Sequence, residues 1–162
     1  DGEVMTFLFS LCLLFNQHYD LSSAQKVNIC KYESEIRNQA KKNNIDPALL
    51  ASVMFVESSF FPHVVSSANA CGLTQVIPKW TGSKETKGKK YTCKQLKDPN
   101  TAIEAGARIL SYSIRVYGKG NVDKGLCVYN AGMKCVTKKG FYKRLYYVKK
   151  VKQVYNTITG GC

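Results

Sequence analysis

One carboxylate and two polar residues recur at an even spacing in the stretch FVESSFFPHVVSSANACGLTQVI, which runs from Phe55 to Ile77. Glu57 is followed after nine residues by Ser66, and Ser66 after nine more by Gln75. Breaking a glycosidic bond requires a proton on the leaving oxygen, and a carboxylic acid that stays protonated near neutral pH can donate it. The stretch is therefore a candidate site for cleaving sugar polymers, with Glu57 as the acid.

The residues before Glu57 predict the helix that positions it. Asp46 and Pro47 are typical of a helix start, with Asp46 as the N-cap and Pro47 in the first turn. Apolar residues then repeat at a spacing of three to four, and Pro62 cannot continue the helix. Glu57 falls in the last turn, where the partial negative charge of the helix end and removal of water by neighbouring aromatic residues (Phe55, Phe60 and Phe61) would raise its pKa. The alternative is a glutamate at a frayed helix end that points into solvent.

Four segments occur in the order found in a known family. They are ESSFFPHVVSS with CGLTQVIP, DPNTAIEAGARIL from Asp98, VYNAG from Val128 to Gly132, and YVKKV from Tyr147 to Val151. Together they resemble the signature of the lytic transglycosylases in the soluble lytic transglycosylase and goose-type lysozyme superfamily. The resemblance covers most of the chain and implies a lysozyme-like domain with a substrate cleft.

The resemblance implies that Glu57 cleaves the β-1,4 bond between N-acetylmuramic acid and N-acetylglucosamine in peptidoglycan without using water. Glu57 would protonate the glycosidic oxygen and then, as the carboxylate, deprotonate the 6-hydroxyl of the same sugar. That hydroxyl would close onto C1 and leave a 1,6-anhydro end. The family pattern gives substrate-binding or orienting roles to five further residues, each of which has a structural alternative: Ser66, Gln75, Tyr129, Asn130 and Tyr147.

Hydrolysis is the first alternative reaction, because glycosidases that use water usually need a second carboxylate. Glu85 is the only other acid between Glu57 and Asp98, although folding could bring Glu104 or Asp123 into the cleft. A goose-type lysozyme would share the fold and the acid but use water. A non-catalytic wall-binding module would keep only the basic surface.

The 162-residue chain has the length of one domain and a formal net charge of +13. This excess of positive charge implies an acidic partner. No nucleic-acid-reading motif accompanies the charge, and the aromatic residues are not interleaved with it as in a stacking platform, so peptidoglycan strands are favoured over nucleic acid. The sequence implies no cofactor. Metal binding is disfavoured, because there is no Cys-x-x-Cys spacing and only His18 and His63 are available.

The segment from Met5 to Ala24 contains the apolar run TFLFSLCLLF and ends in Leu-Ser-Ser-Ala. This pattern is typical of an export signal, although no Lys or Arg precedes the run, and the run is too short to span a bilayer. We therefore expect a signal-like or hydrophobic segment over residues 1–24, which could contact a membrane or an assembly, and a catalytic domain over residues 25–162. The expected location is the periplasm or cell wall, with a phage virion or a secretion-system accessory as alternatives.

The chain contains seven cysteines, and an exported protein is expected to pair most of them. Cys12 lies in the apolar run, and the other six allow 15 pairings. Cys127 and Cys135 bracket VYNAG, which favours that pair. We further expect Cys71–Cys93, around the loop that carries Trp80, and Cys30–Cys162.

The remaining elements are expected to be helical. Spacing predicts helices over residues 26–43, from Asp98 to Gly118, and over residues 121–130, and a last helix carries the stripe Phe141, Leu145, Val148, Val151 and Tyr155. The Gly- and Lys-rich segment 81–94 is expected to be an exposed loop or small hairpin. The fold class is therefore all-α, or at most a lysozyme-like α+β domain with one hairpin.

Overall fold

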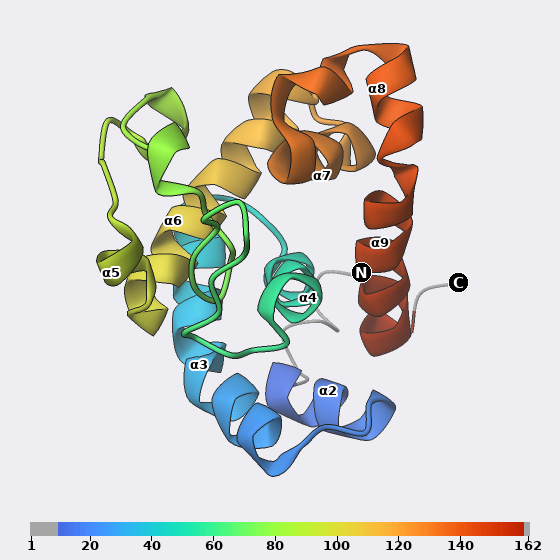
Figure 1. Ribbon diagram of the computed structural model, residues 1–162. Coiled ribbons are helices and arrows are strands. Elements are labelled where there is room, and N and C mark those ends of the chain that lie inside the picture. The colour runs from blue at the N-terminus through green and yellow to red at the C-terminus, as the bar shows by residue number, and fades with distance from the viewer. Residues whose placement is uncertain (1–9, 161–162) are drawn as a thin grey trace.

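The computed structural model describes residues 10–160 and is built almost wholly from helices (Figure 1). The α-helices are α2 (Leu11–His18), α3 (Ser23–Lys42), α4 (Pro47–Ser58), α5 (Cys93–Leu96), α6 (Pro99–Tyr112), α7 (Val122–Ala131), α8 (Lys138–Lys143) and α9 (Leu145–Thr159). Three short 3₁₀ helices, η1 (Pro78–Trp80), η2 (Lys84–Thr86) and η4 (Gly132–Val136), and one π-helical turn, η3 (Ser113–Tyr117), connect them. Residues 10–160 contain two isolated β-bridges and no strand, so the all-α prediction is confirmed.

The helix starts follow from local capping chemistry. The Asp46 carboxylate accepts a hydrogen bond from the Ala48 N–H, and the Asp98 carboxylate accepts one from the Thr101 N–H. Each aspartate precedes a proline in the first turn, where the missing N–H costs nothing. Both predicted aspartate–proline starts are therefore confirmed. The last predicted helix is broken at Arg144, which separates α8 from α9.

Helix α4 lies in the middle of the molecule, with α2, α3, α6, α7 and α9 around it (Figure 1). Its side chains are buried nearly all round, with Leu50, Val53 and Met54 fully inaccessible to solvent. A helix that is apolar on all sides must be enclosed by other elements, and this is how the fold fixes the helix that carries Glu57.

Helix α2 belongs to this core. Leu11 and Phe15 are buried, and the Phe15 ring lies 5.3 Å from the ring of Phe55 and 5.0 Å from that of Phe60. The core therefore includes residues before the domain boundary expected after Ala24. Residues 6–9 of the apolar run lie outside the described residues.

The predicted Cys30–Cys162 disulfide is wrong, because Cys30 is bonded to Cys12. Helix α2 packs against α3, which brings Cys12 beside Cys30. Cys162 lies outside the described residues. The other two expected pairs, Cys71–Cys93 and Cys127–Cys135, are present.

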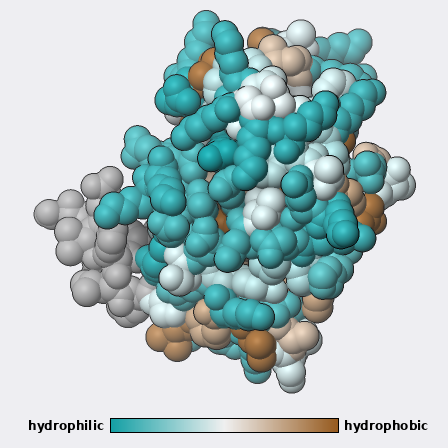
Figure 2. All heavy atoms as spheres, turned by 90° about the vertical axis from the view of Figure 1, so that its left-hand side faces the viewer, coloured by the Kyte–Doolittle hydropathy of each residue, from teal (hydrophilic) through white to brown (hydrophobic). Residues whose placement is uncertain are grey.

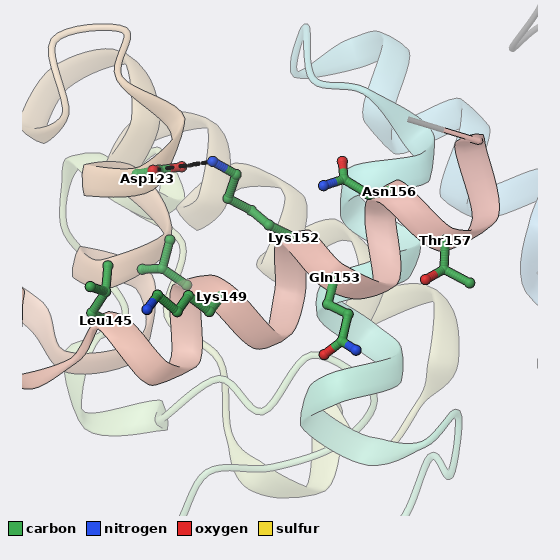
Figure 3. A pocket seen from close by; sticks show the side chains of 8 residues that line it. Asp123, Leu145, Lys149, Lys152, Gln153, Asn156 and Thr157 are labelled. Atoms are coloured by element: carbon green, nitrogen blue, oxygen red, sulfur yellow. Dashed lines mark hydrogen bonds and ion pairs between the residues drawn. The ribbon is translucent and has the colours of Figure 1, made fainter. Parts of the chain in front are cut away.

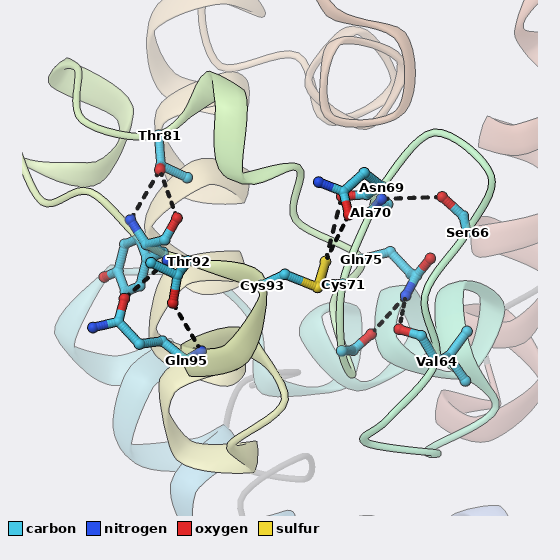
Figure 4. The surroundings of a disulfide bond; sticks show 12 residues. Val64, Ser66, Asn69, Ala70, Cys71, Gln75, Thr81, Thr92, Cys93 and Gln95 are labelled. Carbon is cyan, nitrogen blue, oxygen red and sulfur yellow. Dashed lines mark hydrogen bonds between the residues drawn. A yellow bond between two sulfur atoms is a disulfide. The ribbon is translucent and has the colours of Figure 1, made fainter.

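The segment between α4 and α6 forms a second, smaller lobe around Cys71, Val76, Tyr91, Leu96 and Ala105. The two β-bridges pair Cys71 with Val65 and with Val76, and the Cys71–Cys93 disulfide ties this turn to the start of α5 (Figure 4). Gly72 lies under the Leu96 carbonyl with a φ of +79°, where an added Cβ would come within 1.9 Å of that oxygen. The Gly- and Lys-rich segment 81–94 forms η2 and the start of α5 rather than a hairpin.

The face formed by α5 and the loop around η2 is covered almost entirely by hydrophilic side chains (Figure 2). The exposed lysines of residues 84–97 are Lys84, Lys87, Lys89, Lys90, Lys94 and Lys97. Across residues 10–160, no helix combines the length and apolar character needed to cross a bilayer.

Candidate active site

Helix α9 holds α4 by a hydrogen bond at each end. At the start of α4, the Tyr155 hydroxyl donates to the Asp46 carboxylate at 2.5 Å. In its last turn, the Tyr147 hydroxyl donates to Glu57 Oε2 at 3.0 Å. Tyr147 and Tyr155 are about two turns apart on α9, so one face of α9 reaches both ends of the central helix. The hydrogen bond from Tyr147 therefore fixes the orientation of the Glu57 carboxyl.

The backbone beyond Glu57 is held by polar side chains. The buried Ser58 hydroxyl is 2.7 Å from the Leu73 carbonyl and 3.1 Å from the Met54 carbonyl, so it links the helix end to the following loop. The next two residues, Ser59 and Phe60, both have positive φ, and Asn28 of α3 donates to the Phe60 carbonyl at 2.8 Å. The helix therefore ends sharply, with Glu57 held in its last turn.

Burial raises the pKa of Glu57 from 4.5 to about 7. The hydrogen bond from Tyr147 and the positive charge of Lys150 lower it, but by less than burial raises it. The expected direction of the shift is thus present, with removal of water as its main cause. Of the three phenylalanines expected to shield the acid, Phe60 is fully buried and Phe55 half-buried, whereas Phe61 is 38% exposed.

Ser66 and Gln75 lie on the small turn that follows Glu57 (Figure 4). The Ser66 hydroxyl accepts from the Ala70 N–H at 3.1 Å, and Gln75 Nε2 donates to the Val64 carbonyl at 2.9 Å. Gln75 also has a φ of 52°, so its backbone is held in a left-handed turn. Within residues 10–160 its Oε1 atom has no hydrogen-bond donor, which leaves that acceptor open to a ligand.

Tyr129 and Asn130 lie in the last turn of α7. The Tyr129 hydroxyl donates to the Thr74 carbonyl at 2.6 Å, which connects α7 to the residue before Gln75. The negative charge of Glu57 contributes to raising the pKa of Tyr129, so the two groups lie in one electrostatic environment. Asn130 is exposed, and its side chain makes no hydrogen bond to the part of the chain that the structure describes.

The carboxylates that folding could have brought to Glu57 are engaged elsewhere. Glu104 accepts from the Tyr91 hydroxyl at 2.6 Å and from Lys89 at 3.0 Å, and Asp123 pairs with Lys152 at 3.0 Å. Glu85 accepts from the Tyr117 hydroxyl at 2.6 Å. The charged group that affects the pKa of Glu57 is a lysine, Lys150.

Two residues here were given no role by the sequence analysis. Ser58 follows Glu57 directly, and only the packing of the 73–74 loop against α4 reveals its hydrogen bond to Leu73. Lys150 lies one turn after Tyr147 on α9, so its influence on Glu57 depends on how α9 docks. A signal for Lys150 existed, since residues three positions apart in a helix, such as Tyr147 and Lys150, lie on the same side of it.

A groove of about 560 Å³ runs along the outer side of α9, where Lys152 reaches Asp123, and it does not contain the candidate acid (Figure 3). None of its lining residues is among the predicted site residues. Within residues 10–160, no group of three or more His, Cys, Asp or Glu residues is arranged to hold a metal ion.

Glu57 is thus a half-buried acid at the end of a central helix, hydrogen-bonded by one tyrosine, and no carboxylate of residues 10–160 is among the groups that shift its pKa. The family model described as Transglycosylase SLT domain matches residues 34–150 of this chain. The match covers more than half of the sequence, and the chain belongs to this family.

Curated relatives share sequence with part of the chain. The membrane-bound lytic murein transglycosylase C of Haemophilus influenzae (strain PittEE) is 38% identical over 89 residues, which are 52% of this chain and 25% of that protein. The protein of the same name from Glaesserella parasuis serovar 5 is 33% identical over 102 residues, or 60% of this chain and 28% of that protein. The chain thus spans about a quarter of the length of these relatives.

Two solved structures share the fold. The 70 kDa soluble lytic transglycosylase of Escherichia coli matches 78% of this chain and 24% of its own with a TM-score of 0.65 and 23% identity. The lytic transglycosylase Slt of Pseudomonas aeruginosa, solved as an inactive glutamate-to-glutamine mutant, matches 99% of this chain and 29% of its own with a TM-score of 0.65 and 16% identity. At these identities the likeness establishes the fold.

Proposed function

We propose that this protein is a peptidoglycan lytic transglycosylase that cleaves the β-1,4 bond between N-acetylmuramic acid and N-acetylglucosamine. The observation that carries the proposal is the Glu57 carboxyl, half-buried, with a pKa of about 7 and a hydrogen bond from Tyr147 at 3.0 Å. At such a pKa the group is protonated in a large fraction of molecules at neutral pH and can also lose its proton. One residue can therefore serve as acid and then as base.

In the first step, protonated Glu57 gives its proton to the glycosidic oxygen while the bond from C1 of N-acetylmuramic acid to that oxygen breaks. The N-acetylglucosamine end leaves with a 4-hydroxyl. In the second step, the Glu57 carboxylate takes the proton of the muramic acid 6-hydroxyl while that oxygen bonds to C1. Glu57 ends protonated, as it began, and no water is consumed.

The neighbouring residues support this chemistry in different ways. The open Oε1 acceptor of Gln75 suits an acetamido N–H of the substrate, and exposed Asn130 suits a sugar hydroxyl. Buried Tyr147 orients the acid through its hydrogen bond. Tyr129 acts indirectly, because its hydroxyl donates to the Thr74 carbonyl and so supports the turn that carries Gln75. Ser66 shapes the same turn through its bond to Ala70.

Hydrolysis by a second carboxylate is disfavoured by the partners of the other acids. Glu104, Asp123 and Glu85 each lie in a hydrogen bond or ion pair away from Glu57, and moving one would break those contacts. A goose-type lysozyme would instead use water, and so would need a group that activates it.

The proposed location is outside the cytoplasm, at the cell wall. The three disulfides suit an oxidising compartment, and the net charge of +13 suits an anionic wall polymer. The names of the curated relatives, membrane-bound lytic murein transglycosylases, point to the same substrate.

The test is mass spectrometry of the fragments that the protein releases from purified sacculi, without borohydride reduction. The expected products end in 1,6-anhydro-N-acetylmuramic acid and carry no ¹⁸O when the digestion is done in H₂¹⁸O. Reducing ends that carry ¹⁸O would make the protein a hydrolase. Binding to sacculi without released fragments would make it a wall-binding module.

A further inference from the structure

Trp80 is the only tryptophan in the chain, and its side chain is 66% exposed. It ends the short helix η1, which begins three residues after Gln75. Exposing an indole ring forgoes the stabilisation that its burial would give, so a large exposed aromatic beside a site is a candidate for ligand contact.

The backbone beneath Trp80 is held firmly, although its side chain is exposed. Pro78 restricts the first residue of η1, and the Trp80 N–H donates to the Ile77 carbonyl at 3.0 Å. The buried Thr81 hydroxyl donates to the Pro78 carbonyl at 2.7 Å and accepts from the Tyr91 N–H at 3.0 Å. An aromatic ring presented from a fixed backbone loses little conformational entropy on binding.

Trp80 is close along the chain to the turn that carries Gln75. It follows Gln75 by five positions, so their Cα atoms are at most about 18 Å apart. The Cys71 N–H bonds to the Val76 carbonyl at 2.9 Å, and the Cys71–Cys93 disulfide closes the loop, so this strip of chain has one defined path. A strand of a few sugar units covers such a distance.

We propose that Trp80 is a stacking platform for a sugar ring of the glycan strand, at a subsite away from the bond that is cleaved. The proposal rests on the function proposed above and adds a specificity-determining residue to it. The C–H face of a pyranose ring is apolar and its edges are polar, which matches an indole ring among charged neighbours. The Lys79 ammonium, 5.0 Å from the centre of that ring, is placed to attract the carboxylates of the peptide stem.

A lipid surface is the other occupant that an exposed tryptophan suggests, and the surroundings of Trp80 favour the glycan. Trp80 is the only strongly exposed large apolar side chain within residues 66–115, and the exposed side chains just before this range, Phe61, Val64 and Val65, are 36% to 44% exposed against 66% for Trp80. The chain around Trp80 instead carries exposed lysines, among them Lys79 and Lys84. Insertion into a membrane requires a broader apolar face than one ring.

The experiment uses intrinsic fluorescence, because a single tryptophan makes the emission a direct report on this position. The Glu57→Gln variant of the full chain, which should bind without turnover, is titrated with a β-1,4-linked tetramer of N-acetylglucosamine. We expect a saturable blue shift of the emission. On sacculi, Trp80→Ala should raise KM roughly three- to tenfold, as expected for the loss of one stacking contact, and Trp80→Phe should raise it less. Val27→Ala, at a comparably exposed apolar position on α3, is the matched control and should leave KM unchanged.

Two results would overturn the inference while leaving the proposed function intact. One is an emission spectrum that does not respond to the tetramer, together with an unchanged KM for Trp80→Ala, from a protein that still releases 1,6-anhydro fragments. The other is a shift produced by vesicles of anionic phospholipid and not by the tetramer. If instead the tetramer shifts the emission and the wild-type protein releases no fragments, the stacking site stands and the proposed reaction fails.

Discussion

Glu57 and Glu104 accept a hydrogen bond from a tyrosine hydroxyl, yet their pKa values move in opposite directions. Tyr147 donates to Glu57 at 3.0 Å and Tyr91 donates to Glu104 at 2.6 Å. The pKa of Glu57 is raised to about 7, whereas that of Glu104 is lowered. The tyrosine therefore does not decide the protonation state of either acid.

The two pKa values differ because Glu104 has cations beside it, whereas Glu57 has lost contact with water. Glu104 lies 3.0 Å from Lys89 and 3.4 Å from Arg108, which both favour its charged form. Glu57 lies in the last turn of a buried helix, where loss of water outweighs the tyrosine and the more distant charge of Lys150. A carboxylate held by ion pairs stabilises the fold, whereas a carboxyl without such a pair keeps a proton that chemistry can use.

The largest expected difference between the two acids is in catalysis. Glu57→Gln keeps the shape of the side chain but has no proton to donate, so release of fragments from sacculi should fall by roughly 10²–10⁴-fold or more. Glu104→Gln changes an acid that lies in an ion-pair network and should retain most of the activity. Turnover at matched protein concentration, with circular dichroism to verify folding, measures both.

A Glu57→Gln variant that is folded and active would contradict the assignment of Glu57 as the acid. Equal losses in both variants would show that Glu104 also serves the reaction, and the comparison between the two sites would fail.

The second expected difference is in stability, where the two substitutions should have opposite signs. The folded pKa of Glu57 is raised, so burying its ionised form destabilises the protein. This destabilisation is absent below pH 4.5, the unfolded pKa, and grows as the pH rises through about 7. Glu57→Gln should therefore be more stable than the wild type at a pH of about 8, by roughly 2–3 kcal/mol relative to the difference at a pH of about 4. Urea unfolding at both pH values measures this change.

Glu104 should behave in the opposite way. Its folded pKa is lowered, so its stabilisation is present above the unfolded value and is lost as pH falls through the folded one. Glu104→Gln should reduce the free energy of unfolding at neutral pH by on the order of 1 kcal/mol, with a smaller effect in acid. The same sign for both variants at neutral pH would contradict the assignment of one buried acid and one paired acid.

The sequence predicted the position of Glu57 because each local signal agreed. The Asp46 cap, Pro47 in the first turn and the apolar spacing all fixed the length of α4, and the helix end followed. The environment of Glu57 could not be predicted from the sequence, since Tyr147 and Lys150 reach it only through the packing of α9 on α4. The partners of Glu104 and Asp123 could not be predicted from the sequence either, so the sequence left open whether a second carboxylate lies beside Glu57.

The N-terminal helix shows a different limit of sequence reasoning. A short apolar run has the same composition whether it is an export signal or a buried helix, and only the packing of Phe15 against Phe55 and Phe60 distinguishes the second role. The Cys12–Cys30 disulfide was missed for the same reason, because Cys12 lay in that run. We infer that α2 belongs to the same domain as α4, since Phe15 packs against Phe55 of the helix that carries Glu57.

The third prediction separates the two tyrosines. The hydrogen bond from Tyr147 lowers the pKa of Glu57, so Tyr147→Phe should raise that pKa further and move the alkaline limb of kcat/KM to higher pH by up to about one unit. Tyr91→Phe acts on Glu104, whose two cations remain, and should leave the limb in place. A limb that moves to lower pH in Tyr147→Phe would mean that the phenol acts mainly by excluding water from Glu57.

The smallest expected effect tests whether charge reaches Glu57 from α9. Lys150 is exposed and lowers the pKa of Glu57 through space, so Lys150→Gln should move the alkaline limb upward by a few tenths of a unit. Because salt screens exposed charges, the shift should be present in dilute buffer and disappear at high ionic strength. Lys149→Gln, at the neighbouring exposed position, is the matched control and removes the same formal charge. If both variants shift the limb equally, the net charge of the protein acts on Glu57 as a whole. A shift in Lys150→Gln alone would locate the effect on the side of α9 that also carries Tyr147. Glu104 has no such contact with α9, because the groups that shift its pKa are Tyr91, Lys89 and Arg108.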